Sequence, residues 1–496
     1  MSATISRASA APSMTRRLVY IIGAVVVGAG VTMLPSVAVS LIYGENGDAA
    51  AILLASLVTV GIGVAAWRVW GRRGVLTTRE GFAAVGLAWF VMSTFGTLPY
   101  LFSGAIPDIA SAFFETASGF TTTGASVVAD PGELGHGILL WRSTTQWVGG
   151  MGIIVLSIAV LPLLGVGGVQ LARAESPGHT PDRLTPRFQE TAKRLWLVYV
   201  AFTAVETVLL WAGDMTAFQA VNHAFTTMST GGFGTEATSI NGFSAYTQWV
   251  IIAFMFLAGV SFALHFRALR RPGDYLRHAE FRLYTAFTVV AAVVIVGGIA
   301  SDGTAIGDAI RDAVFTATTL ITTTGFATAD FGAWREALQI FVIGLMFIGG
   351  MAGSTAGAVK TFRVGVLSKA AAADLRRLVH PNGVFITRFG RERVRDEVVE
   401  SVQSFFLFYM FLFMTATFLV AFIDANLSEE LDLVTSASAV AASLGNIGPG
   451  LGDVGPTANY ATIPDAGKWL LSWLMIVGRL EIFPVLVLFT RDLWRR

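Results

Sequence analysis

The chain has 496 residues, of which 54% are hydrophobic and 14% are charged, and its mean hydropathy is +0.65. This composition carries more apolar surface than a soluble domain can bury, so we expect the protein to lie in a lipid bilayer. Cysteine is absent, which excludes disulfides, thiolate metal sites and cysteine nucleophiles. The formal net charge of +1 by itself indicates nothing about partners. We expect no nucleic-acid partner.

Ten apolar stretches are long enough to cross a membrane as helices, because a span needs roughly 20 apolar residues. The first is too long for the apolar core of a signal peptide, so we expect it to be retained. The predicted spans are residues 18–43, 49–67, 82–102, 144–164, 195–212, 246–266, 284–300, 337–358, 405–423 and 469–489.

The distribution of basic residues predicts the orientation, because positively charged loops stay cytoplasmic. With both termini cytoplasmic, five connections or tails on that side are rich in Arg and Lys: residues 68–79, 173–194, 267–282, 360–395 and 491–496. The opposite side is rich in Asp and Glu. Ten spans with both termini inside satisfy the rule.

Four shorter semi-apolar stretches begin and end on the outer side and cannot cross the bilayer. They are residues 108–118, 216–228, 306–321 and 431–444. Each leads into a segment rich in Gly and Thr or polar residues. Non-helical backbone at membrane depth is tolerated where it is buried in protein or lines a water-filled cavity. We therefore predict four re-entrant pore elements, each a short helix followed by a loop.

The four loops resemble one another in sequence. Superposing residues 121–125, 228–232, 322–326 and 445–449 aligns Gly124, Gly231, Gly325 and Gly448, which are separated by 107, 94 and 123 residues. This spacing indicates repeated supersecondary units. Small residues also pack helices closely in lipid without conducting ions, but four copies at consistent positions favour a pore.

The residue types in these loops suit a binding site for a dehydrated cation. Backbone carbonyls in a ring can replace the hydration shell of the ion, and glycine adopts the dihedral angles that such a ring requires. The predicted filter residues are Thr122, Thr123, Gly124, Ser229, Thr230, Gly231, Thr323, Thr324, Gly325, Asn446, Ile447 and Gly448.

At these residues the chain resembles the Trk/Ktr/HKT superfamily of potassium transporters. The strongest matches are the runs at residues 118–125, 349–357, 446–450 and 478–481. The resemblance implies an all-α polytopic membrane protein with four covalently linked helix–pore-loop–helix repeats around one pore, preceded by two extra transmembrane helices. We accordingly divide the chain into residues 1–80, the repeats at 81–172, 173–272 and 273–395, and a fourth at 396–496.

The resemblance further implies a gating loop that interrupts the second helix of the third repeat. Its residues and their neighbours would be Gly349, Gly350, Gly353, Ser354, Thr355, Gly357, Lys360 and Arg479. The glycines support a broken helix, since each costs about 1 kcal/mol relative to alanine in a helix interior; a small-residue packing face is the alternative. Snorkelling at the cytoplasmic face also accounts for Lys360 and Arg363.

Arg479 stands in the middle of an apolar span, where an unpaired arginine costs at least about 2.5–3.5 kcal/mol. Either it pairs with an acidic residue such as Glu206, or it lies beneath the filter and limits ion occupancy or contacts the gating loop. We expect Glu115, within the first short helix, to support the backbone behind a filter loop.

These features predict potassium uptake through a channel-like filter in the inner membrane, with K+ as the transported ion and no organic cofactor. The six histidines lack metal-ligand spacing, and no nucleotide-binding or catalytic motif is visible, so we expect no enzyme activity. The resemblance implies a homodimer and a cytosolic nucleotide-binding ring (TrkA-like) as regulator. The alternative is an ion-coupled secondary cation symporter, because broken helices and repeats also characterise that class.

Overall fold

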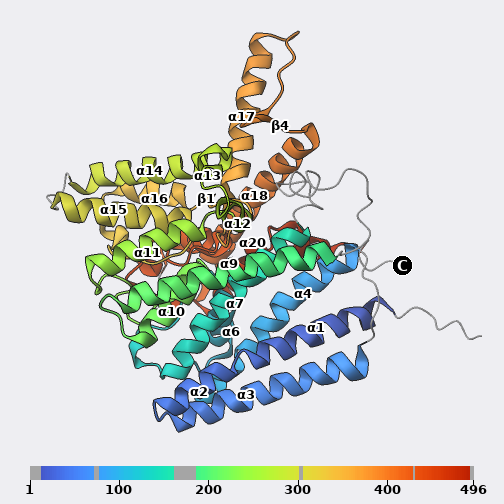
Figure 1. Cartoon of the computed structure of the whole chain (residues 1–496), viewed down its shortest axis with the longest axis vertical. Helices are drawn as coiled ribbons and strands as arrows, with labels where there is room; N and C mark the ends of the chain where they lie inside the picture. The colour runs from blue at the N-terminus through green and yellow to red at the C-terminus, as the bar shows by residue number, and fades with distance from the viewer. Residues whose placement is uncertain (1–12, 72–77, 161–185, 301–304, 428–430, 492–496) are drawn as a thin grey trace, which may run out of the picture. The chain divides into compact units, whose positions relative to one another are not determined.

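The computed structural model describes residues 13–71, 78–160, 186–300, 305–427 and 431–491. These residues are helical over most of their length (Figure 1). The chain divides into two compact units. The first comprises residues 1–107, 136–138 and 483–496, and the second comprises residues 108–135 and 139–482.

The first unit contains the amino-terminal helices and the last turn of the chain. Its elements are α1 (Met14–Val31), α2 (Leu34–Ile42), α3 (Asn46–Val64), a π-helix (Ala65–Trp70), α4 (Thr78–Gly96), α5 (Leu98–Ser103), α21 (Phe483–Leu486) and a 3-10 turn (Val487–Phe489). Small residues bring α1 and α3 together: a Cβ on Gly63 would lie 2.8 Å from the Val27 backbone nitrogen. The Ser56 hydroxyl donates to the Gly30 carbonyl at 2.8 Å. This close packing through small residues is typical of helices in lipid.

The second unit begins with α6 and continues through the helices up to residue 277. These elements are α6 (Ile109–Phe120), a 3-10 turn (Pro131–Glu133), α7 (His136–Val160), α9 (Pro186–Trp211), α10 (Ala217–Met228), α11 (Ala245–Ala258), α12 (Phe262–Ala268) and α13 (Asp274–Arg277). The first three residues of α7 belong to the first unit.

The remaining elements of the second unit include the few strand residues of the described chain. They are α14 (Ala279–Ala300), α15 (Ile306–Ile321), a 3-10 turn (Phe331–Ala333), α16 (Glu336–Leu345), β1 (Ile348–Gly349), β2 (Val359–Lys360), α17 (Thr361–Val379), β3 (Arg388–Phe389), β4 (Glu392–Arg393), α18 (Asp396–Leu427), α19 (Leu433–Gly445), two 3-10 turns (Gly452–Val454 and Tyr460–Thr462) and α20 (Asp465–Arg479). Strands β1 and β2 pair in parallel, and β3 and β4 pair antiparallel.

The four short predicted helices correspond to α6, α10, α15 and α19, and polar side chains begin three of them. The Asp108 carboxylate accepts from the Ser111 backbone N–H at 2.7 Å, and the Asp432 carboxylate does the same for Thr435 at 2.7 Å. Thr216 and Gln219 form a capping box at the start of α10. Such caps satisfy backbone N–H groups that have no partner within the helix.

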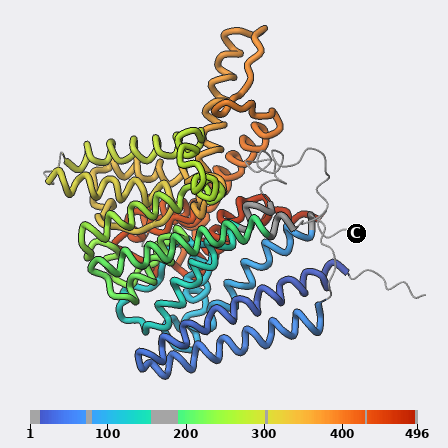
Figure 2. Tube along the Cα trace, in the orientation of Figure 1, coloured from blue at the N-terminus to red at the C-terminus, as the bar shows by residue number. Residues whose placement is uncertain are grey.

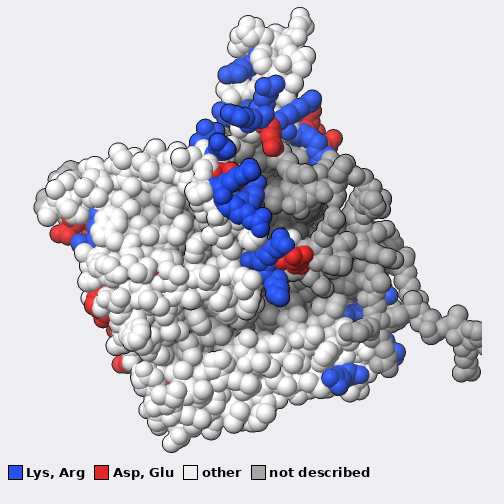
Figure 3. Space-filling model, in the orientation of Figure 1, with Lys and Arg blue, Asp and Glu red and all other residues white. Residues whose placement is uncertain are grey.

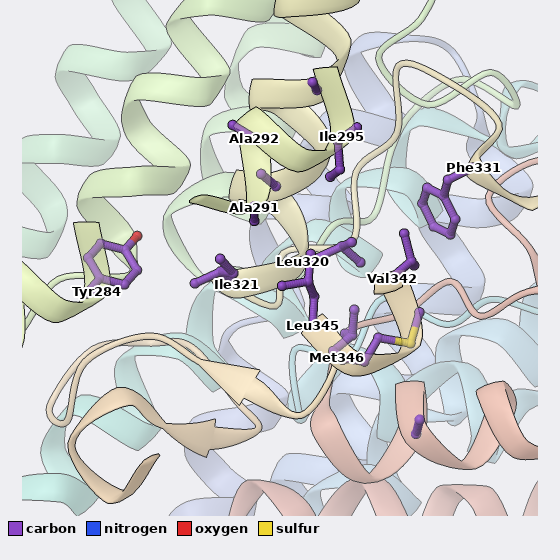
Figure 4. Close-up of a cluster of buried hydrophobic side chains, with 14 of the residues drawn as sticks. Tyr284, Ala291, Ala292, Ile295, Leu320, Ile321, Phe331, Val342, Leu345 and Met346 are labelled. Carbon is purple, nitrogen blue, oxygen red and sulfur yellow. The ribbon is translucent and has the colours of Figure 1, made fainter. Parts of the chain in front are cut away.

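Apolar side chains pack the helices of the second unit against one another. Around α15, Ile295 of α14, Leu320 of α15 and Val342 of α16 are fully buried in one cluster, which also includes Leu345 and Met346 (Figure 4). The long helix α17 runs away from this packed region, and the chain returns through β3 and β4 into α18 (Figure 2). Lys and Arg side chains gather on this extension (Figure 3).

In the described part of the chain, six helices are long and apolar enough to cross a membrane, or eight if each bent pair counts as one span. Several predicted spans are not single helices, and two of them are sharply bent. The span predicted at 246–266 is bent by 100° between α11 and α12. The span predicted at 469–489 is interrupted after α20, where Glu481 and Ile482 adopt positive φ angles of 59° and 66°, which L-residues rarely adopt within a helix.

Candidate functional site

The four short helices end in the same backbone conformation. Two residues beyond α6, α10 and α15, and one residue beyond α19, the φ angles are between 52° and 55°; these residues are Thr122, Thr230, Thr323 and Asn446. The next residue donates its backbone N–H to a carbonyl of the last helical turn: Thr123 to Ser118, Gly231 to Thr226, Thr324 to Thr319 and Ile447 to Ala442, each at 2.8 Å. The four segments are therefore structurally equivalent, residue by residue.

This equivalence corrects the predicted alignment of the second loop by one residue. The glycines with positive φ angles are Gly124 (84°), Gly232 (77°), Gly325 (84°) and Gly448 (105°). Gly232, and not Gly231, thus corresponds to the other three, while Gly231 occupies the position of Thr123. Two adjacent glycines made both alignments possible in sequence, and only the backbone dihedral angles distinguish them. We call residues 121–125, 229–233, 322–326 and 445–449 the four glycine loops.

The glycine loops form a closed ring. A Cβ on Gly124 would lie 2.2 Å from the Gly231 carbonyl oxygen, and one on Gly232 would lie 2.0 Å from that of Thr324. A Cβ on Gly325 would lie 2.0 Å from the Ile447 oxygen, and one on Gly448 would lie 2.7 Å from the Thr123 oxygen. Each glycine therefore contacts a carbonyl of the next loop, and the fourth contacts the first. A side chain at these positions would displace backbone.

Beyond the ring, the chain segments that follow the glycine loops line one pocket. Its lining includes Gly124, Gly232, Gly325 and Pro449, one residue from each loop. Ser126, Glu236 and Asn459 add polar groups from the connecting segments. The ring thus opens to a polar pocket on the side away from the ends of the short helices.

Threonine hydroxyls brace two of the glycine loops. The Thr121 and Thr123 hydroxyl oxygens lie 2.8 Å apart, and those of Thr322 and Thr324 also lie 2.8 Å apart. In the fourth loop, the Asn446 side-chain amide donates to the Thr123 hydroxyl at 3.0 Å and to the Met475 carbonyl at 2.9 Å. The predicted polar residues of these loops therefore stabilise the ring, in addition to any contact with an ion.

Glu115 supports the first loop, and its partner Arg142 was not singled out from the sequence. Glu115 accepts from the Val127 backbone N–H at 2.9 Å and from Arg142 Nε at 2.9 Å. Arg142 also donates to the Gly234 carbonyl at 3.2 Å and lies over the Phe233 ring. Both charged groups are buried. The available sequence signal for Arg142 was its position two residues before the predicted span at 144–164.

Residues 350–358, between β1 and β2, form a loop against the carboxyl ends of the short helices. We call this segment the β1–β2 loop. The Thr355 hydroxyl donates to the Met228 carbonyl at 3.2 Å, and the Ala358 N–H donates to the Gly445 carbonyl at 2.9 Å. The Gly357 N–H donates to the Thr323 hydroxyl at 2.6 Å. The predicted interruption of the helix at 349–357 is therefore observed, and the segment meets three of the four glycine loops or their helices.

The β1–β2 loop is also tied to the bend between α11 and α12. Met351 donates its backbone N–H to the Gly259 carbonyl at 2.9 Å, and Phe262 donates to the Gly353 carbonyl at 3.1 Å. Glu280 of α14 accepts from the Ala352 N–H at 2.7 Å. These bonds use backbone groups that a straight helix would keep for itself, which explains why the predicted span at 246–266 is bent.

Arg479, at the end of α20, contacts the β1–β2 loop directly. Its Nη1 donates to the Thr355 carbonyl at 2.6 Å, and its side chain is buried. Among the described residues no ion pair joins it to Glu206, so the sequence hypothesis of that pair is wrong. The carbonyl contact agrees with the other interpretation, in which the arginine touches the loop.

Lys360 and Arg363 are buried, which corrects their interpretation as snorkelling anchors. Lys360 Nζ donates to the Ala356 carbonyl within the β1–β2 loop. Arg363 forms an ion pair with Glu481 at 2.5 Å and lies over the Phe405 ring. Of the other predicted loop residues, Gly349 pairs with Lys360 in the β1–β2 ladder, Gly350 approaches the Gly259 carbonyl, Gly353 has a φ angle of 79° and Ser354 donates to the Met351 carbonyl at 2.6 Å.

Within the described ranges, no group of three or more His, Asp or Glu side chains could hold a metal ion. His223 and His265 instead contact backbone carbonyls through a ring nitrogen, at 2.9 Å and 2.8 Å. The ring brings together four backbone carbonyl oxygens, one from each glycine loop. Hard monovalent cations are bound by such oxygens and not by imidazole clusters.

Comparison with known proteins places the chain in a family. Residues 51–495 match the TrkH family model, described as a cation transport protein. The "Trk system potassium uptake protein TrkH" of Escherichia coli (strain K12) is 39% identical over 97% of this chain and 99% of that protein. The TrkI protein of Halomonas elongata is 35% identical over 92% of both chains.

A solved structure agrees with this assignment. The crystal structure of the potassium transporter TrkH from Vibrio parahaemolyticus superposes with a TM-score of 0.88 at 35% identity, covering 97% of this chain and all of that one. These relatives are named as a potassium uptake protein and a potassium transporter, which is a transport function and not catalysis. The chain therefore belongs to the TrkH family of cation transport proteins.

Proposed function

We propose that the protein takes up potassium through a channel-like selectivity filter formed by the four glycine loops. The observation that carries the proposal is the closed ring, in which each of four glycines contacts a carbonyl of the next loop. Carbonyl oxygens held at fixed spacing can replace the hydration shell of one monovalent cation. The relatives named as potassium uptake proteins support potassium as the ion.

The short helices add an electrostatic contribution to this proposal. The carboxyl end of α6, α10, α15 and α19 each leads directly into a glycine loop. A helix carries about half a negative charge at its carboxyl end. Four such ends beside one ring favour a cation there and disfavour an anion.

The β1–β2 loop would act as the gate. It contacts Met228, Thr323 and Gly445, on the side of the ring where the short helices end. Arg479 adds a positive charge bonded to the same loop. A cation leaving the ring on this side would meet the loop, so its displacement would open the path.

We also propose that the chain consists of an amino-terminal pair of helices followed by four repeats. It would lie in the inner membrane with both termini cytoplasmic. The equivalent backbone of the four glycine loops supports the repeats. A homodimer and a cytosolic nucleotide-binding ring as regulator are also proposed. The basic extension around α17 offers the regulator an accessible charged surface (Figure 3).

Labelled rubidium uptake into liposomes that contain the purified protein tests the proposed filter. We expect potassium to compete with rubidium and sodium to compete poorly. Gly124→Ser should weaken this discrimination, because the added side chain would meet the Gly231 carbonyl. Unchanged selectivity and conductance in that variant would contradict the filter.

The second candidate is an ion-coupled cation symporter, favoured by the helix breaks at α11–α12 and α16–α17. A symporter requires stoichiometric coupling of rubidium uptake to a proton or sodium gradient. Uptake down the rubidium gradient alone, unaffected by collapsing the other gradients, supports the channel. Strict dependence on a proton or sodium gradient supports the symporter.

A further inference from the structure

Gln146 of α7 reaches from one helix to the backbone of the second glycine loop. Its side chain is fully buried. Its Nε2 donates to the Gly231 carbonyl at 2.7 Å, and its Oε1 accepts from the Phe233 N–H at 3.1 Å. The backbone partners are one acceptor and one donor, so they determine which way the amide points. One side chain therefore forms hydrogen bonds with the backbone of the residues before and after Gly232.

The second loop needs this support because it lacks the brace found in two other loops. The first and third loops have hydroxyl pairs, Thr121 with Thr123 and Thr322 with Thr324. The second loop has Ser229 at the first of these positions but Gly231 at the second. A Cβ on Gly231 would lie 2.4 Å from Gln146 Cδ, so the glutamine fills the space that a side chain at residue 231 would take.

Gln146 also acts on a group that belongs to the ring. The Gly231 carbonyl oxygen is the one against which Gly124 packs. The neighbouring Gly149 and Gly150 bring α7 close to the loops, since a Cβ on Gly150 would lie 2.8 Å from Ser229 Cα. The spacing between the first and second loops therefore depends on the Gln146 amide.

We propose that Gln146 is a positioning residue for ion selection, which holds the second glycine loop at the spacing that favours potassium over sodium. The inference rests on the proposed function of the ring as a filter. Without the amide, the Gly231 carbonyl can shift, and the ring can contract around the smaller ion. Selectivity should then fall while conduction continues.

The test measures rubidium uptake by the full chain in liposomes, in competition with potassium and with sodium. Gln146→Leu removes both hydrogen bonds at similar volume. We expect the potassium-to-sodium preference to fall about fivefold, the effect of losing the one bond that holds the Gly231 carbonyl. Gln339→Leu is the matched control, because the Gln339 amide donates to the Gly332 and Trp334 carbonyls, at 2.7 Å and 2.8 Å, away from the ring. That control should keep the wild-type preference.

A compensating pair separates positioning from general stability. Gln146→Ala makes room at residue 231, and adding Gly231→Thr supplies a hydroxyl that can reach Ser229, as in the first and third loops. We expect the double variant to recover most of the preference lost in Gln146→Ala. If Gln146→Leu fails to fold, Gln146→Glu tests the same point, because it keeps the acceptor for Phe233 and removes the donor to Gly231.

Each outcome has a distinct meaning. A wild type that shows no selective rubidium uptake overturns the proposed function and this inference together. A selective wild type with an equally selective Gln146→Leu or Gln146→Glu variant overturns the inference alone. The third outcome is loss of all transport in both Gln146→Leu and Gln146→Glu, with no recovery in the variant that combines Gln146→Ala and Gly231→Thr. That result shows a merely structural role for Gln146 and also overturns the inference.

Discussion

Gly231 and Gly232 are adjacent and chemically identical, yet their surroundings differ. A Cβ on Gly232 would lie 2.0 Å from the Thr324 carbonyl oxygen, while one on Gly231 would meet the end of the Gln146 side chain. Displacing the backbone costs more free energy than moving the end of a side chain. Gly232 also has a φ angle of 77°, which costs an L-residue roughly 1–2 kcal/mol.

We therefore expect Gly232→Ala to reduce rubidium uptake about tenfold relative to wild type, given that conformational cost. Gly231→Ala should reduce it less, because Gln146 can yield. Uptake by the two variants, reconstituted at equal protein density, provides the comparison. A larger loss in Gly231→Ala would show that the ring glycine of the second loop is misassigned.

The buried pair of Glu115 and Arg142 makes a second prediction for single residues. Removing one partner leaves an uncompensated buried charge, which typically costs about 3–5 kcal/mol. Arg142→Met should therefore lower the thermal unfolding temperature in detergent strongly. The double variant Glu115→Gln with Arg142→Met should recover part of the loss, since no charge remains and the Gln oxygen can still accept from Val127. Equal melting temperatures for wild type and Arg142→Met would contradict this account.

Among the elements, the β1–β2 loop differs most from a simple apolar span. Its backbone bonds with Gly259, Phe262, Gly445 and the Thr323 hydroxyl replace the bonds of a continuous helix. Most are single hydrogen bonds between segments, each contributing about 1 kcal/mol net. Such a segment can rearrange while α16 and α17 remain helical, as a gate must.

Arg479→Ala should raise rubidium uptake about tenfold, because a hydrogen bond from a charged group contributes about 1.5–3 kcal/mol and the variant loses the one to Thr355. Lys468→Ala is the control on the same helix, since Lys468 pairs with Asp465 at 3.5 Å instead. Unchanged or reduced uptake in Arg479→Ala, with normal uptake in Lys468→Ala, would show that Arg479 does not hold the gate closed.

For the whole molecule, the natural absence of cysteine allows a direct test of orientation. Glu133 and Arg391 are both exposed, and the distribution of basic residues places them on opposite sides of the membrane. A membrane-impermeant maleimide should label Glu133→Cys in intact cells and Arg391→Cys only after lysis. The reverse pattern would invert the proposed topology, and with it the direction in which the gate faces.

The amino-acid sequence by itself determined the class of protein, the number and place of the four short helices, and the break at residues 349–357. These depend on local properties: runs of apolar residues that are long enough, or too short, to cross the bilayer, and glycines that a helix tolerates poorly. The role of Glu115 behind the first loop also followed from its place within an apolar helix. Such signals are read along the chain and need no knowledge of distant contacts.

Only the tertiary structure decided which glycine of the second loop belongs to the ring, where α11 bends, and what Arg479, Arg142 and Gln146 contact. Gly231 and Gly232 are distinguished by backbone dihedral angles, which the closure of the ring imposes. The bend of α11 depends on bonds with a loop about ninety residues away in sequence. A polar side chain in an apolar helix must find a partner, but the sequence leaves several within reach, and the packing of distant segments selects one.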